Sequence, residues 1–335
     1  MKKIGVGNLC RTCVSRMLLL CVLLSFQCGC GQLEIENRAF PLALAIQPGK
    51  EKGMYDFSFF FEETGSAGSG LYYREDTVVE AEGYPQAFTM FGRAQAAQLD
   101  DSHMQAILMS EELLKDKEFL ASFYQYFIKE HHFSWNTMVY LTDKNSLEIS
   151  KLSKAAGGHP GMYLKDIAES DEQEKTASVP TLGDLYKEWN NHEKIMLLPV
   201  LGGKKPPTVD HYRVLVYGEL SEKYTLDEAR LLQLLKGDLN KLQVSLKDET
   251  VVRLEGVFLW PEQEQNTDKW TVTLHARCIA ENRTTLSEEA QLRVRNECEE
   301  VLMQRLERVR AYAPIKMSDG SYEIPNYKIK LNWME

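Results

Sequence analysis

The sequence predicts an α+β fold, in which mixed or antiparallel sheets pack with helices in two main regions, with three small domains as the alternative division. Short apolar and β-branched runs are interspersed with segments that have helical spacing. These strands and helices follow no steady βαβ period, as a doubly wound parallel sheet would require. In the second half, strand patterns at 242–246, 250–260 and 269–280 follow one another directly, which indicates antiparallel neighbours.

The chain begins with a secretion signal rather than with an element of the fold. Four basic residues and no acidic residue accompany an apolar run of ten at 17–26. Ten apolar residues are about half of the roughly 20 that a membrane-spanning helix needs. A basic start followed by a short apolar run is typical of a signal peptide. We therefore expect residues 1–29 to be removed.

Cys30 is the predicted lipidation site and the first residue of the mature chain. Gly29 and Cys28 before it are small, as in bacterial lipoprotein signals, although Gln27 is a poor match for the usual leucine. Cys28 itself fits worse, because Phe26 and Gln27 are large. Two acyl chains suffice for stable anchoring, so a diacylglycerol thioether on Cys30 would hold the protein to a bilayer. Ordinary secretion with cleavage nearby and an uncleaved anchor are the alternatives.

The composition restricts the class of partner. Removal of the signal takes the formal net charge from −10 to −14. Such an acidic body argues against nucleic acid, whose phosphates require clustered Lys and Arg. The same charge argues against adhesion to anionic lipid by electrostatics. The 306 residues that remain after removal of 29 from 335 suffice for two domains.

Cysteine usage gives little support for a disulfide framework. Five of the seven cysteines fall within the first 30 residues, which leaves Cys278 and Cys298 besides the lipidation site. Cys278 alternates onto one strand face with Val272 and Leu274, and Cys298 shares a helical stripe with Val294. Both are therefore expected to be small core residues, with a Cys278–Cys298 bridge as the alternative.

In the first half, turn residues and apolar spacing predict the elements. Apolar runs at 39–46 and 54–61 flank a turn with Pro48 and Gly49, which predicts a β-hairpin. Ser110 is expected to cap a helix, since two glutamates follow it. Further strands are expected at 77–82, 104–109, 136–142 and 195–201, helices at 85–99, 110–129, 145–155 and 182–192, and loops at 64–70 and 170–181.

Residues 202–208 (GGKKPPT) form the strongest linker pattern in the chain, and they predict a boundary between domains at 30–201 and 209–335. Beyond the linker, Thr225 and Glu228 have the spacing of a capping box, and Gly237 marks the end of that helix. A strand at 212–220, a long helix at 286–312 and a final strand at 327–333 complete the predicted elements.

No motif for catalysis, metal binding or cofactor binding stands out. The sequence lacks Gly-x-Ser-x-Gly and H-E-x-x-H, and Gly202-Gly203-Lys204 lacks the upstream glycine of a phosphate-binding loop. His131 and His132 are expected at the surface, and His103 is expected to make a structural hydrogen bond. We therefore predict a non-enzymatic protein with no catalytic, metal-binding or cofactor-binding residue.

Two residue classes remain candidates for other roles. The paired carboxylates, including Asp100-Asp101, Glu111-Glu112 and Glu299-Glu300, are expected to be solvated or to lie at helix starts, since neighbours in sequence need not face one substrate. The dense aromatic run with Phe57, Phe59, Phe60 and Phe61 is expected to pack in the core; a sheet face for a partner subunit is the alternative.

Three stretches in order resemble one family. They are Cys30 followed by L-E-I-E-N-R-A-F-P-L-A-L-A-I, then S-H-M-Q-A-I-L-M-S-E-E-L-L at 102–114, then Y-T-L-D-E-A-R-L-L-Q-L-L-K-G and V-S-L-K-D-E-T-V-V-R-L-E within 224–255. Together they resemble the Ger(x)C lipoproteins, the C subunits of spore germinant receptors, over nearly all of the mature chain.

The resemblance implies a lipoprotein on the outer face of the inner spore membrane. It implies assembly with a polytopic A subunit and a transmembrane B subunit in a receptor for small nutrients, without catalytic residues. Whether this subunit itself contacts the nutrient is left open. A solute-binding lipoprotein of a transporter is the alternative function, and it predicts two α/β lobes with repeated parallel βα units.

Overall fold

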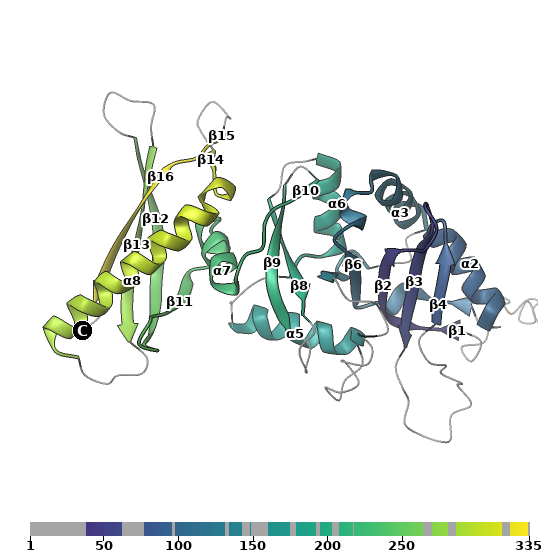
Figure 1. The fold of residues 1–335 in the computed structure, drawn as a ribbon, viewed down its shortest axis with the longest axis horizontal. Helices are drawn as coiled ribbons and strands as arrows, with labels where there is room; N and C mark the ends of the chain where they lie inside the picture. Colours follow the sequence, from purple (N-terminus) through teal and green to yellow (C-terminus); the bar gives the residue numbers. More distant parts are fainter. Residues whose placement is uncertain are drawn as a thin grey trace, which may run out of the picture. The chain divides into compact units, whose positions relative to one another are not determined.

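A computed structural model of the chain describes residues 38–61, 77–95, 98–130, 134–142, 148, 160–174, 179–191, 195–202, 208–216, 218–263, 270–280, 286–316 and 322–333. The chain divides into two compact units, Met1–Arg38 and Ala39–Glu335. The fold below is that of the second unit. It contains two larger sheets with helices packed on them (Figure 1), which confirms the predicted α+β class.

The described elements agree with most of the predicted ones. The strands are β1 (Arg38–Ala39), β2 (Pro41–Pro48), β3 (Tyr55–Phe61), β4 (Thr77–Ala81), β5 (Gln98–Leu99), β6 (Ala106–Ser110), β7 (Met138–Thr142), β8 (Met196–Leu201), β9 (Val209–Val216), β10 (Glu219–Leu220), β11 (Lys241–Ser245), β12 (Val251–Gln263), β13 (Trp270–Ala280), β14 (Ile315–Lys316), β15 (Tyr322–Glu323) and β16 (Asn326–Trp333). The helices are α2 (Tyr84–Gln95), α3 (Lys117–Glu130), α5 (Pro160–Glu174), α6 (Leu182–Asn191), α7 (Leu226–Leu235) and α8 (Glu288–Val309), with 3₁₀ turns η2 (Asp101–His103), η3 (Leu113–Lys115) and η4 (Arg310–Tyr312).

The larger sheet has eight strands in the order β10-β9-β8-β7-β6-β2-β3-β4. Its central strands β2, β6, β7 and β8 are parallel, and antiparallel strands extend it on both sides. The predicted hairpin of β2 and β3 is confirmed, with Leu44 opposite Phe59. Parallel central strands are covered on both faces in most proteins, and their sequences are accordingly apolar without alternation.

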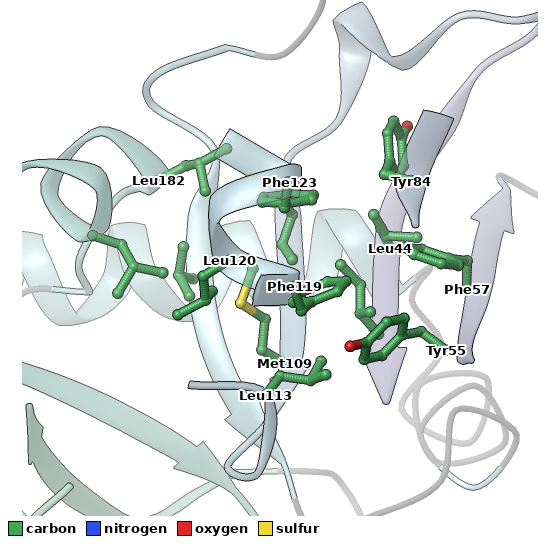
Figure 2. Packing of buried hydrophobic residues seen from close by; sticks show 14 of the residues in the cluster. Leu44, Tyr55, Phe57, Tyr84, Met109, Leu113, Phe119, Leu120, Phe123 and Leu182 are labelled. Atoms are coloured by element: carbon green, nitrogen blue, oxygen red, sulfur yellow. The ribbon is translucent and has the colours of Figure 1, made fainter. Parts of the chain in front are cut away.

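Both faces of this sheet are buried. On one face, Leu44, Phe57 and Phe59 belong to a core that includes side chains of α2, α3 and α6. Figure 2 shows part of it, with Phe119 and Phe123 of α3 close to the side chains of the strands. Phe60 belongs to a smaller core on the opposite face. The aromatic run therefore packs in the core, as predicted, and it does so on both faces of β3.

Helix α5 covers the second face and was not predicted. The expected loop at 170–181 is wrong in its first part, because α5 continues to Glu174. The helix lies very close to β2: a Cβ added at Gly161 would overlap the Leu42 carbonyl oxygen. Small residues on the sheet, including Ala43 and Ala45, allow this approach. The predicted loop at 64–70 lies outside the described residues, as does all but residue 148 of the predicted helix at 145–155.

The start of α3 corrects the predicted cap. Ser110 is the last residue of β6 and does not cap this helix. Instead, Asp116 Oδ1 accepts a hydrogen bond from the Phe119 amide at 3.0 Å, and Asp116 Oδ2 accepts one from the Tyr55 hydroxyl at 2.6 Å. Burial alone would raise the pKa of Asp116, but these hydrogen bonds outweigh it and hold the pKa below its usual value.

The smaller sheet has the order β11-β12-β13-β16, with the first three strands antiparallel, as predicted, and β16 parallel to β13. Helix α8 lies along it (Figure 1). The predicted capping box of α7 is confirmed, since the Thr225 side chain accepts from the Glu228 amide and the Glu228 side chain from the Thr225 amide. The inward side chains of the four-stranded sheet form one core with α7 and α8.

The predicted linker lies between two paired strands. Strand β9 pairs antiparallel with β8, and the Gly202 amide donates to the Thr208 carbonyl at 2.9 Å. Residues 203–207 themselves lie outside the described residues. The eight-stranded sheet thus includes strands from both sides of 202–208, while Tyr212 and Val214 of β9 belong to the core of the smaller sheet. The position of the domain boundary stays a prediction.

We expect Asp116→Ala to lower the free energy of unfolding by about 1–2 kcal/mol, because α3 loses its cap and Tyr55 loses an acceptor. The folded-state pKa of Asp116 is lowered, so its contribution is present above the unfolded pKa of about 4 and is lost as the pH falls through the folded value. Urea unfolding of wild type and Asp116→Ala at pH 7 and pH 3 measures this loss, and we expect the difference between the two proteins to be smaller at pH 3. Ser110→Ala is the matched control, with a change within about 0.5 kcal/mol; an equal loss in both variants would contradict the assignment.

Candidate functional site

The predicted lipidation site, Cys30, lies outside the described residues. Among the helices that the structure describes, none is both long enough and apolar enough to cross a bilayer. Within the same described part of the chain, no group of three His, Cys, Asp or Glu side chains is arranged to hold a metal ion. The candidate features are therefore ionisable clusters and exposed surfaces.

The expected position of Asp100 and Asp101 at a helix start is confirmed, since they begin the η2 turn, but the expected solvation is wrong for Asp101. Asp101 is fully buried, and its Oδ2 accepts a hydrogen bond from the Tyr84 hydroxyl at 2.9 Å. Burial and the neighbouring carboxylate together raise the pKa of Tyr84 well above its usual value. Asp100, by contrast, caps the η2 turn through the Ser102 amide. The pair joins α2 to the turn before β6 and serves the fold.

Glu111 also has a structural partner rather than a position at a helix start. Its Oε2 lies 3.0 Å from Arg213 Nη1 of β9, and its Oε1 lies 4.0 Å from His211 Nε2. His211 Nδ1 lies 3.1 Å from Asp210 Oδ2. Glu299 of α8 is likewise not simply solvated, because its Oε1 accepts a hydrogen bond from the Leu331 amide of β16 at 3.3 Å. His103 is exposed, and its ring contacts Phe40 edge-on.

Glu228 joins the two helices of the smaller core. Besides closing the capping box, its Oε1 lies 2.5 Å from Nη1 of Arg308 on α8. The Arg308 guanidinium also lies over the Tyr224 ring and donates to the Lys223 carbonyl. The Glu228 side chain is only 5% exposed, and its carboxylate oxygens are paired with Arg308 and with the Thr225 amide.

Cys278 and Cys298 are free and fully buried, which confirms that they are core residues. Burial raises the pKa of each thiol to about 12. Neither thiol is therefore ionised at neutral pH, and neither has the properties of a reactive or metal-binding cysteine.

The surface that stands out is the outer face of the four-stranded sheet, on the side opposite α8. We define this outer face by Phe258 and Trp260 of β12, His275 and Arg277 of β13, and Lys328 and Lys330 of β16. Strand pairing places these residues in rows, with Phe258 beside His275 and His275 beside Lys330. The Phe258 and His275 rings are stacked, with centroids 4.8 Å apart. Phe258 and Trp260 remain 53% and 55% exposed.

A β-bulge at Gly256 turns these aromatic side chains outward. Up to Glu255, the even-numbered residues Val252 and Leu254 are buried. The pairing then shifts by one residue between Glu255 and Phe258, and Gly256 has a φ of +58°. Beyond the bulge, Val257 and Leu259 pack against the core instead. A shift of one residue exchanges the two faces of a strand.

The outer face could not be recognised from strand alternation for that reason. Simple alternation from Val252 and Leu254 assigns Phe258 and Trp260 to the core. The glycine at 256 within an otherwise regular strand pattern was the available signal, since isolated glycines in strands often mark bulges.

Comparisons with known proteins give one family match. The family model described as the spore germination protein N-terminal domain matches residues 31–202, which is just over half of the chain. Among solved structures, the crystal structure of the GerBC protein is similar, with 12% sequence identity and a TM-score of 0.49, covering 87% of this chain and 96% of that one. No curated protein sequence matches.

We expect Glu228→Ala to lower the free energy of unfolding by about 2 kcal/mol, because it removes both the capping box and the partner of Arg308. Glu228→Gln keeps an oxygen for the capping box and should cost about half as much. Glu222→Gln is the control, since the Glu222 side chain is 64% exposed and lies 3.8 Å from Arg308. Thermal or urea unfolding measures the series; a Glu222→Gln loss as large as that of Glu228→Ala would contradict it.

We further expect Cys278 and Cys298 to resist iodoacetamide at pH 8 in the folded protein, because both thiols are buried and un-ionised. In denaturant without reductant, peptide mapping should find both alkylated. A bridge between them would instead leave both unmodified until a reductant is added.

Proposed function

The chain belongs to the Ger(x)C family of spore germination proteins, and from this we propose that it is the lipid-anchored C subunit of a nutrient germinant receptor. The observation that carries the proposal is the span of the family match. It begins at residue 31, directly after Cys30, and ends at 202 at the start of the predicted linker. The predicted mature chain and the family domain thus start within one residue of each other.

In this proposal the protein is held by a diacylglycerol on Cys30 to the outer face of the inner spore membrane. There it assembles with the A and B subunits and contributes to the response to small nutrients. Its role is to bind partners rather than to catalyse a reaction. The buried carboxylates Asp101 and Glu228 support this, because each holds elements of the fold together through Tyr84 or Arg308.

The alternative, a solute-binding lipoprotein, expects a second lobe of parallel βα units. The four-stranded sheet has a different construction, since β11, β12 and β13 are antiparallel and follow one another directly in sequence. Its single long helix, α8, lies between β13 and β16 in the chain. The carboxy-terminal region is therefore not such a lobe.

The expected outcome in the sporulating host is that deletion of the gene abolishes the response to at least one nutrient, and that the full chain restores it. Cys30→Ala should be extracted from the membrane fraction by high salt, unlike wild type, and should fail to restore germination, because it cannot carry the diacylglycerol. Cys28→Ala is the matched control and should behave like wild type. Mass spectrometry of the amino-terminal peptide should find the lipid on Cys30.

Co-purification tests the assembly separately. The A and B subunits should be recovered with the membrane-bound wild-type chain. Lipid on Cys28, an unmodified amino terminus, or normal nutrient germination in the deletion strain without a related copy would each overturn the proposal.

A further inference from the structure

The outer face carries a set of side chains that its environment does not explain. Apolar side chains on strands normally point to a core, yet Phe258 and Trp260 are more than half exposed on one strand. They lie two residues apart beyond the Gly256 bulge, so both project from the same face. Beside them, Thr273 and His275 occupy the neighbouring positions of β13.

The charge of the outer face is opposite to that of the molecule. In the next strand, Lys328 pairs with Thr273 and Lys330 with His275, so two lysines flank the aromatic rows. Arg277 lies over the bulge, where its guanidinium would be 3.3 Å from a Cβ on Gly256. Two acidic residues of β12, Glu255 and Glu262, share this face, and Glu255 is ion-paired with Arg253 at 3.0 Å. A locally cationic surface thus occurs on a chain whose net charge is −10.

This combination suits a lipid headgroup layer better than a protein partner. The centres of protein–protein interfaces are depleted in lysine, whereas two lysines here adjoin the aromatic rings. Tryptophan is enriched where proteins meet the membrane–water interface, because its ring is apolar and its N–H needs a polar partner. Lysine extends an apolar stem and places its charge among phosphates.

We propose that the outer face docks on an anionic phospholipid bilayer, with Phe258 and Trp260 in the headgroup layer and Lys328 and Lys330 against lipid phosphates. The net charge of the chain argued against such contact, but electrostatic attraction is screened beyond about 8 Å at physiological salt, so the charge of the contacting face decides whether it binds. The remaining acidic surface then favours the orientation in which this face meets the lipid. The docking does not depend on lipidation at Cys30 or on the proposed receptor role.

Vesicle binding by the chain that starts at Gly31 tests the proposal, because it lacks Cys30 and the signal. That chain retains the compact unit from Ala39 onward, which contains all three cores. We expect it to sediment with vesicles of equimolar phosphatidylcholine and phosphatidylglycerol, weakly or not at all with phosphatidylcholine alone, and less as salt is added. Lys328→Gln with Lys330→Gln should weaken binding by about fivefold for each lysine.

Two matched controls separate this face from general effects. Lys50→Gln with Lys52→Gln removes exposed lysines from the β2–β3 turn and should leave binding unchanged. Phe258→Ala with Trp260→Ala should reduce binding, whereas Leu292→Ala, which removes a 49% exposed side chain from α8, should not. Melting curves establish that each variant is folded, and the lysine pair tests the proposal even if the aromatic pair does not fold.

The proposal is overturned if the chain does not bind anionic vesicles, which would leave an acidic protein as the occupant of this face. It is equally overturned if binding to neutral vesicles is as strong, or if the Lys328 and Lys330 variant binds like wild type. A failure here would leave lipidation at Cys30 and assembly with receptor subunits untouched, because neither enters this experiment.

Discussion

The structure depends on one constraint: the eight-stranded sheet must be covered on both faces. Its central strands alternate between two cores, as in β2, where Leu44 and Ile46 contribute to one core and Ala43 and Ala45 to the other. Strand β8 is buried at every position for the same reason. Each face therefore needs its own layer of helices, and the apolar area involved is the main source of stability.

The second face is divided between two covers. Helix α5 covers the part near β2 and β6, where small residues allow it to approach the backbone closely. Further along the sheet, Leu197, Tyr212 and Val214 belong instead to the core that includes α7 and the four-stranded sheet. The Lys236 ammonium also donates to the Ile195 carbonyl at 2.6 Å. The carboxy-terminal region thus completes the burial of β8 and β9 and is more than an appended module.

Features determined by neighbours in sequence could be predicted. The β2–β3 hairpin follows from its turn residues, and the α7 capping box follows from Thr225 and Glu228. Helix α5 was missed because its second half is polar and its buried side rests on small residues such as Gly161. Asp101 was misjudged because its partner, Tyr84, lies 17 residues away on another helix. Burial of this kind comes from tertiary contacts, which composition does not contain.

The candidate site divides in the same way. Cys30 is identified by its immediate neighbours, so a sequence is sufficient to suggest it. The outer face arises from one extra residue in a long strand, and its effect appears only through pairing with β13. The residue inserted at Gly256 thus decides on which face of β12 each later side chain lies. In a relative, deletion of that one residue would move Phe258 and Trp260 to the buried face without changing either aromatic residue. Alignments of relatives should therefore first establish whether the bulge residue is present, and only then compare the residues that follow it.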